Sequence, residues 1–247
     1  MANWNDPQPG QTGFGASPSL NGEAIGRVGM DAGLRRHMLS IYNYMASGVL
    51  LSGIVALLFA RSGMAEQVMA TPLKWLIMLA PLGFVMFMSF SVNRSSASTL
   101  KTAFWAFCVV MGLSMSTIFL VFTGASIATT FFATAGAFAG LSLVGYTTKK
   151  DLSAMGSFMT MGLIGIIIAG LVNMFLQSSG LHLAISVLGV LIFAGLTAWD
   201  TQRLKNEYTM VAGTEYAAKA VVMGALSLYL DFINMFQFLL SFLGNRE

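Results

Sequence analysis

Residues 220–243 read AVVMGALSLYLDFINMFQFLLSFL, an apolar run that holds a single charged side chain, Asp231, near its middle. Its length matches the roughly 20 residues that an α-helix needs to cross a hydrocarbon core about 30 Å thick. Six comparable runs precede it, at 41–60, 73–92, 102–122, 125–146, 154–176 and 181–199. None alternates apolar and polar residues as barrel strands do, so the sequence predicts an all-α, polytopic bundle of seven transmembrane helices.

The composition supports a bilayer as the main solvent. Hydrophobic residues make up 56% of the 247 residues and charged residues 9%, with a mean hydropathy of +0.74. A soluble domain carries about 25% charged residues, so a water-soluble fold is excluded. The net charge of +3 is spread over short loops, which argues against a nucleic-acid partner. The single cysteine, Cys108, excludes an intrachain disulfide and makes a Cys/His zinc site implausible.

Two regions follow from the same pattern. Residues 1–36 are rich in Gly, Pro, Asn, Gln and Ser, which predicts a disordered cytoplasmic tail with helix starting at about Asp31. Residues 37–247 form the seven-helix membrane domain. The first residues lack the basic and apolar segments of a cleavable signal peptide, so we expect the first span to direct membrane insertion. Tight turns are expected at 123–124 and 177–180.

The basic residues set the expected orientation. Three of them lie on the side of the carboxyl terminus, namely Arg61, Lys74 and Arg246. Ten lie on the side of the amino terminus, namely Arg27, Arg35, Arg36, Arg94, Lys101, Lys149, Lys150, Arg203, Lys205 and Lys219. By the positive-inside rule we expect an inner (plasma) membrane protein with a cytoplasmic amino terminus and an external carboxyl terminus.

Small residues recur in two of the spans. Gly136 and Gly140 are four residues apart in 125–146, and Gly162, Gly165 and Gly170 occur in 154–176. Such spacing allows close backbone contact between helices, and we interpret it as helix packing.

Asp231 is the most informative polar residue. It lies close to the midplane of its span, where a charged carboxylate costs about 2.5 kcal/mol or more. Ser227, Asn234 and Ser241 fall on the same helical face, and Tyr229 points the opposite way. Without Asp231 this polar face would indicate an interhelical hydrogen-bond seam. With it, we interpret the face as the lining of a cavity or pore.

Asp200 ends the predicted sixth span. It is either an interfacial charge paired with Arg203 or Lys205, or a partner of Asp231 that shares a proton with it. Straight-helix geometry places it about 12 Å nearer the cytoplasm than Asp231, which leaves contact between them open. Arg94, at the end of the second span, is either a positive-inside anchor or a cation that reaches one of the aspartates.

At these residues the chain resembles the transmembrane BAX inhibitor motif (Bax inhibitor) family, in its bacterial branch. The resemblance runs from about residue 36 to 244, and its specific segments are 89–94 (SFSVNR), 145–151 (GYTTKKD), 195–203 (GLTAWDTQR) and 224–236 (GALSLYLDFINMF). It implies seven helices, with the last one central and surrounded by the other six. It also implies a pH-sensitive calcium leak gated by an aspartyl pair at Asp200 and Asp231, with Arg94 as a latch.

The resemblance and the residues lead to one functional expectation and one alternative. Calcium prefers carboxylate and carbonyl oxygens, so we expect Asp200, Asp231 and Asn234 to offer it a site beside Ser227, with calcium as the transported ion and no cofactor. The alternative is a regulatory protein that binds other membrane proteins, with structural aspartates.

We do not expect an enzyme. The segment before Asp231 lacks the Gly-x-Gly-Asp motif of intramembrane aspartyl proteases. The chain has no lysine deep in a span for retinal, and its histidines, His37 and His182, lie at span ends, unlike the histidine within a helix of a rhomboid protease. The bilayer is the expected partner, and protein partners are not predictable from the sequence.

Overall fold

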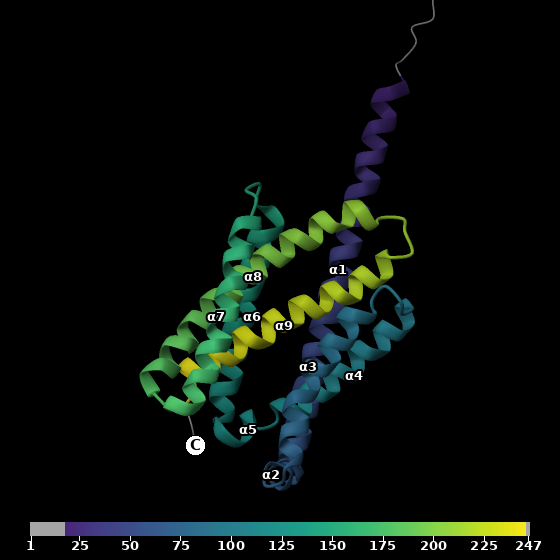
Figure 1. Cartoon of the computed structure of the whole chain (residues 1–247). Helices are drawn as coiled ribbons and strands as arrows, with labels where there is room; N and C mark the ends of the chain where they lie inside the picture. Colours follow the sequence, from purple (N-terminus) through teal and green to yellow (C-terminus); the bar gives the residue numbers. More distant parts are fainter. Residues whose placement is uncertain (1–17, 246–247) are drawn as a thin grey trace, which may run out of the picture.

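Helices form every regular element of the part of the chain that the structure describes (Figure 1). The computed structural model describes residues 18–245, with side chains from residue 30 onward. The helices are α1 (Pro18–Arg61), α2 (Met64–Met69), α3 (Leu73–Ser91), α4 (Ala97–Met115), α5 (Ile118–Val121), α6 (Gly124–Thr147), α7 (Ser153–Leu176), α8 (Ser179–Val211) and α9 (Ala217–Leu243).

Seven helical segments are long and apolar enough to cross a membrane, which confirms the all-α, seven-span prediction. They are α1 from Met30, α3, α4 continued through α5, α6, α7, α8 and α9. Because α1 begins at Pro18, residues 18–36, which the sequence assigned to the tail, are helical. Residues 1–17 of that tail lie outside the described residues, and the boundary at residue 36 stays a prediction.

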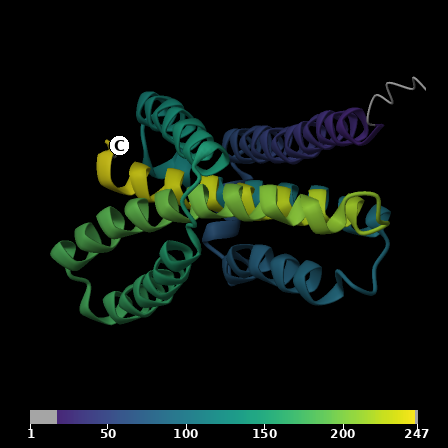
Figure 2. The ribbon, with the colours of Figure 1, turned by 90° about the horizontal axis from the view of Figure 1, so that it is seen from above.

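Helix α9 runs through the middle of the bundle (Figures 1 and 2). Half of its most apolar window is buried, the largest share among the seven spans. It packs against α1, α4, α6 and α8, whereas α3 packs mainly on α4 and α7 mainly on α8. The last helix is therefore central, as predicted, but four helices enclose it closely and α3 and α7 stand outside them.

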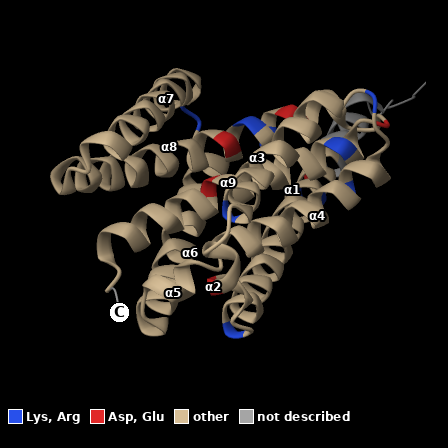
Figure 3. Ribbon diagram, turned by 60° about the horizontal axis from the view of Figure 1, so that its bottom comes forward, with Lys and Arg blue, Asp and Glu red and all other residues tan. Residues whose placement is uncertain are grey.

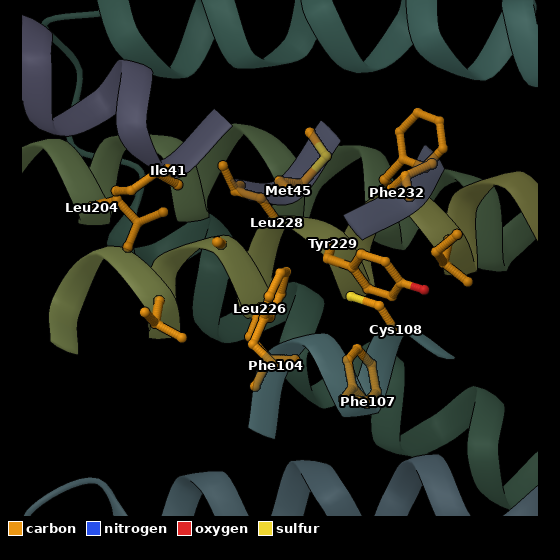
Figure 4. Close-up of a cluster of buried hydrophobic side chains, with 14 of the residues drawn as sticks. Ile41, Met45, Phe104, Phe107, Cys108, Leu204, Leu226, Leu228, Tyr229 and Phe232 are labelled. Atoms are coloured by element: carbon orange, nitrogen blue, oxygen red, sulfur yellow. The ribbon is translucent and has the colours of Figure 1, made fainter. Parts of the chain in front are cut away.

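The face of α9 that meets α1 and α4 is an aromatic core (Figure 4). Tyr229 is fully buried there, with its ring centroid 6.3 Å from that of Phe104 and 5.1 Å from that of Phe107. Its hydroxyl lies 2.6 Å from Ser52 Oγ, which donates to the carbonyl of Cys108 at 2.7 Å. These contacts anchor one face of α9 and leave Asp231 to face another part of the bundle.

Helix α8 corrects the predicted position of Asp200. The sixth span does not end at this residue, because α8 continues to Val211 and is 33 residues long. Asp200 lies 11 residues before the end of α8, and Asp231 lies 14 residues after the start of α9. At about 1.5 Å per residue these offsets are about 17 Å and about 21 Å, so the two residues reach similar depths.

The predicted tight turns have local causes. Thr123 caps α6 by accepting a hydrogen bond from the backbone N–H of Ser126 at 3.3 Å, and Ser178 caps α8 in the same way from Leu181. Helix α7 ends where Gln177 adopts a left-handed conformation with a φ of 48°. Short turns then place α6 beside α5 and α8 beside α7 as antiparallel neighbours.

Of the glycines that the spacing indicated, only Gly162 lies at a close contact between helices, where a Cβ atom would meet the side chain of Ile192 at 3.0 Å. A Cβ atom built at Gly136 or Gly140 would have no neighbour within 4 Å, so the interpretation of this pair as a packing contact is wrong within the chain. On α6 the close approach is at Gly145, where a Cβ atom would overlap the backbone of Ala198. Gly145 therefore sets the spacing of α6 and α8 two residues before Asp200.

We expect Gly145→Ala to lower the free energy of unfolding by about 1–3 kcal/mol, because the added methyl group overpacks this contact. Thermal unfolding of the purified protein in detergent measures the effect. Gly140→Ala, in open space on the same helix, is the control and should leave stability unchanged or raise it by about 0.5–1 kcal/mol. Equal destabilisation by both substitutions would contradict the close approach.

Candidate functional site

Two buried carboxyl groups meet where α8 and α9 run side by side. Asp200 and Asp231 are each 5% exposed, and their carboxyl groups lie close enough to interact electrostatically. Figure 3 shows acidic residues on both helices in this part of the bundle. Two carboxyl groups this close together cannot both ionise cheaply, which favours a proton shared between them.

Polar neighbours hold Asp200 in place. Ser227 Oγ donates to Asp200 Oδ2 at 2.5 Å and accepts from Arg203 Nη2 at 3.0 Å. Arg203 Nη2 also lies 2.9 Å from Asp200 Oδ1, one turn back along α8, and its guanidinium lies 4.9 Å from the ring centroid of Trp199. The pairing of Asp200 with Arg203 that the sequence suggested is therefore present, and it coexists with the contact to Asp231.

One carboxyl oxygen of Asp231 receives no hydrogen bond from a described donor. Its Oδ2 atom is buried and has no hydrogen-bond partner among the described residues. It lines a cavity of about 700 Å³ between α7, α8 and α9, which we call the central cavity. Asp200, Ser227 and Asn234 line the same cavity, so the structure brings together four of the five predicted site residues.

Asn234 supplies an oxygen to the central cavity. Its Nδ2 atom donates to the carbonyl of Leu230 at 2.8 Å, which leaves Oδ1 as the free acceptor of the amide. The cavity therefore offers side-chain oxygens from two carboxyl groups, one amide and one hydroxyl. No group of three or more His, Cys, Asp or Glu side chains suited to a metal ion occurs among the described residues.

Arg94 does not join this group. It lies exposed in the turn after α3, and no described acidic side chain forms an ion pair with it. The cation beside the carboxyl pair is Arg203, which the sequence analysis treated as a basic residue at the membrane surface. Because α8 continues past Asp200, Arg203 lies within the helix instead of in a loop.

Arg203 also separates the central cavity from a second one. This smaller cavity, of about 310 Å³, lies between α3, α8 and α9, and we call it the vestibule. Glu207 and Ser89 line the vestibule, and Arg203 and Ser227 line both cavities. The Arg203 side chain is 45% exposed. Arg203 and Ser227 therefore border both the vestibule and the cavity that holds the carboxyl pair.

An aromatic contact forms part of the wall of the central cavity beyond Asn234. Phe238 stacks on Phe193, with ring centroids 5.9 Å apart, and fits against Gly189, where no Cβ atom obstructs it. One turn further along α9, Ser241 Oγ lies 3.3 Å from His182 Nε2 and accepts from Ser186 at 3.2 Å. The predicted polar face of α9 therefore continues beyond the rings, with Phe238 between its two parts.

Gln202 and Lys205 hold the end of α6 and the loop after it, and Lys205, the alternative partner expected for Asp200, binds a backbone carbonyl instead. Gln202 Nε2 donates to the carbonyl of Lys150, and its Oε1 accepts from the backbone N–H of Leu152, both at 2.8 Å. Lys205 Nζ donates to the carbonyl of Tyr146 at 2.7 Å, at the end of α6. Gln202 lies in the GLTAWDTQR segment and Lys205 lies just after it, which could have pointed to their roles. Polar residues at these positions, however, also suit a surface loop.

The fold and the carboxyl pair define a polytopic membrane protein with a polar centre. Residues 34–247 match the family described as inhibitor of apoptosis-promoting Bax1. The inner membrane protein YbhL of Escherichia coli K12 is 44% identical over 220 residues, which cover 87% of this chain and 94% of that protein. A protein of Caulobacter vibrioides is 47% identical over 233 residues, 89% of this chain and 93% of the relative.

A third relative, RP147 of Rickettsia prowazekii, is 45% identical over 218 residues, 88% of this chain and 92% of the relative. The chain belongs to the Bax inhibitor family, which confirms the resemblance seen in the four sequence segments. It is a multi-pass membrane protein of that family.

Replacing Gln202 with alanine should loosen the loop between α6 and α7. The substitution leaves the carbonyl of Lys150 and the N–H of Leu152 without their partners, at a cost of about 1–3 kcal/mol. We expect a lower melting temperature and faster amide hydrogen exchange at residues 150–153. Asn206→Ala, an exposed change on the same helix, is the control, and similar exchange in both variants would show that Gln202 does not hold the loop.

Proposed function

We propose that this protein is a pH-sensitive calcium leak channel or transporter, and that the central cavity is its ion-binding site. The observation that carries the proposal is the contact between Asp200 and Asp231, two buried carboxyl groups that line one cavity. A charged carboxylate at membrane depth is costly and needs a partner, a proton or an ion. In this proposal calcium and protons compete for the carboxyl pair.

The oxygen ligands of the central cavity suit a weakly bound, transported ion better than a tightly bound one. Calcium takes six to eight oxygen ligands at about 2.3–2.6 Å, mostly from carboxylates, carbonyls and water. The central cavity provides side-chain oxygens from Asp200, Asp231, Asn234 and Ser227, so water has to complete the shell. Such an incomplete site binds weakly, and an ion that crosses the membrane has to leave again.

The charges around the carboxyl pair explain the proposed pH sensitivity. On α8 the pair faces Arg203, and Arg203 in turn faces Glu207. Helix α7 contributes no titratable side chain to the lining of the central cavity. Proton binding removes negative charge from the pair, which weakens its attraction for both calcium and Arg203. Calcium entry through the vestibule requires the guanidinium to release Asp200, so Arg203 takes the role of latch in this proposal in place of Arg94.

Substitution of Asp231 tests the proposal directly. We expect Asp231→Asn to lower calcium flux into liposomes about tenfold and to remove its dependence on pH, because the amide keeps the shape but carries no charge and binds no proton. Asp151→Asn, an exposed change in the loop between α6 and α7, is the control and should behave as the wild type does.

The same measurement separates the channel from the alternative. Purified protein is the only protein in these liposomes, so a regulatory protein with structural aspartates would pass no calcium at all. Wild-type protein without flux, or an Asp231→Asn variant with unaltered pH-dependent flux, would overturn the proposed function.

The aromatic contact gives a second test with the opposite sign. Phe238→Ala removes the ring between Asn234 and Ser241, so we expect calcium flux to rise several-fold. Phe175→Ala removes a ring that is 89% exposed on α7 and serves as the control. Flux that stays at the wild-type level in the Phe238 variant would show that the rings do not close the path.

We further propose that the protein lies in the inner membrane with its amino terminus in the cytoplasm. The name of YbhL, an inner membrane protein, supports the first part. The basic residues support the second, because most of them lie in the segments on the side of the amino terminus. In this orientation the vestibule opens toward the cytoplasm, and His182 lies toward the outer face.

A further inference from the structure

A groove of about 540 Å³ lies between α1 and α6, and we call it the α1–α6 groove. It shares no lining residue with the central cavity. Met38, Met45 and Phe138 form its floor as buried side chains, whereas Leu39 and Leu143 on its edges are 51% and 63% exposed. Figure 2 shows α1 and α6 on the same side of α9. The groove is therefore an apolar surface open to the membrane.

The length of the groove matches one leaflet. On α1 its lining runs from Arg35 to Ala46, a rise of about 16 Å at about 1.5 Å per residue. The hydrocarbon core of a bilayer is about 30 Å thick, so the groove covers about half of it. A transmembrane helix of a partner would need a surface along the full thickness, whereas one leaflet is the depth of a lipid acyl chain.

Positive charge gathers at one end of the groove only. Arg35 lines this end, and no acidic side chain among residues 30–245 forms an ion pair with it. Tyr146 lines the same end on α6, and Lys205 Nζ lies 5.1 Å from the centroid of its ring. An occupant with a negatively charged head and an apolar tail would match this distribution of charge.

A buried hydroxyl group lies one turn deeper. Ser142 is 6% exposed and lines the groove, but its Oγ atom has no hydrogen-bond partner among the described residues. Other hydroxyl groups of α6 bond back to the carbonyl four residues earlier, as Thr134 does to Thr130 and Thr147 to Leu143. A buried hydroxyl without a partner costs free energy, so Ser142 needs an acceptor from outside the chain.

We propose that the α1–α6 groove binds an anionic phospholipid of the leaflet at the basic end of the bundle. Its phosphate lies at Arg35, with Lys205 nearby. The glycerol ester oxygens reach the level of Ser142, about 6 Å deeper than Tyr146 along α6, and accept its hydrogen bond. One acyl chain follows the floor from Met38 to Met45. Free phosphate would leave this apolar length empty.

Native mass spectrometry of the full chain in detergent tests the site. The protein is mixed with equal amounts of dioleoyl phosphatidylglycerol and dioleoyl phosphatidylcholine, and the retained lipid is identified by mass. We expect one phosphatidylglycerol to be retained in preference to phosphatidylcholine. Arg35→Gln should lower the affinity for phosphatidylglycerol about fivefold and leave that for phosphatidylcholine unchanged. Ala139→Trp fills the groove from an exposed position on α6 and should lower both.

Two matched variants serve as controls. Arg36→Gln removes the neighbouring exposed charge outside the groove, and Ala137→Trp adds the same ring elsewhere on α6. Both should retain phosphatidylglycerol as the wild type does, and thermal unfolding confirms that all four variants fold.

Four results would overturn the proposal. The first is a loss of phosphatidylglycerol binding in Arg36→Gln equal to that in Arg35→Gln, which would indicate attraction by general surface charge. The second is unchanged lipid binding in Ala139→Trp. Displacement of the lipid by millimolar inorganic phosphate would indicate a plain anion site. Dimers that exclude the lipid would show that a second copy of the chain covers the groove.

Discussion

The contact between Asp200 and Asp231 imposes the main constraint on this structure. Two carboxyl groups at membrane depth cannot face lipid, and both cannot keep a full charge at close range without a cation. The helices that carry them must therefore lie against each other, with a polar space around the pair. The central position of α9, the length of α8 and the guanidinium of Arg203 beside Asp200 all satisfy this requirement.

The two faces of α9 have different roles: one packs against neighbouring helices and the other lines the central cavity. On one face Tyr229 packs into an aromatic core that contains no charged group, which fixes the helix against α1 and α4. On the other, Ser227, Asp231 and Asn234 line a cavity that α7 covers from outside. The packing around Tyr229 holds α9 in place. The face that carries Asp231 can therefore line an open cavity without a shift of the helix.

The sequence predicted what depends on hydropathy and missed what depends on tertiary contacts. The seven spans, the turns and the direction of Tyr229 follow from periodicity and length. The end of α8 does not, because residues 200–211 are polar and suit a loop. They are helical since their side chains bind neighbours: Gln202 the loop after α6, Lys205 the end of α6, and Arg203 the carboxyl pair. Arg94 lies in the exposed turn after α3, and no ion pair with a described acidic side chain involves it.

The length of α8 also links the site to the surrounding lipid. At 33 residues it extends about 50 Å, well beyond a hydrocarbon core of about 30 Å. A helix this long is accommodated by tilting or by a local change in the thickness of the bilayer. Either response changes how far the polar third of α8, from Asp200 onward, stands above the acyl chains. Membrane thickness is thus a variable that sets the hydration of this helix, independently of any ligand.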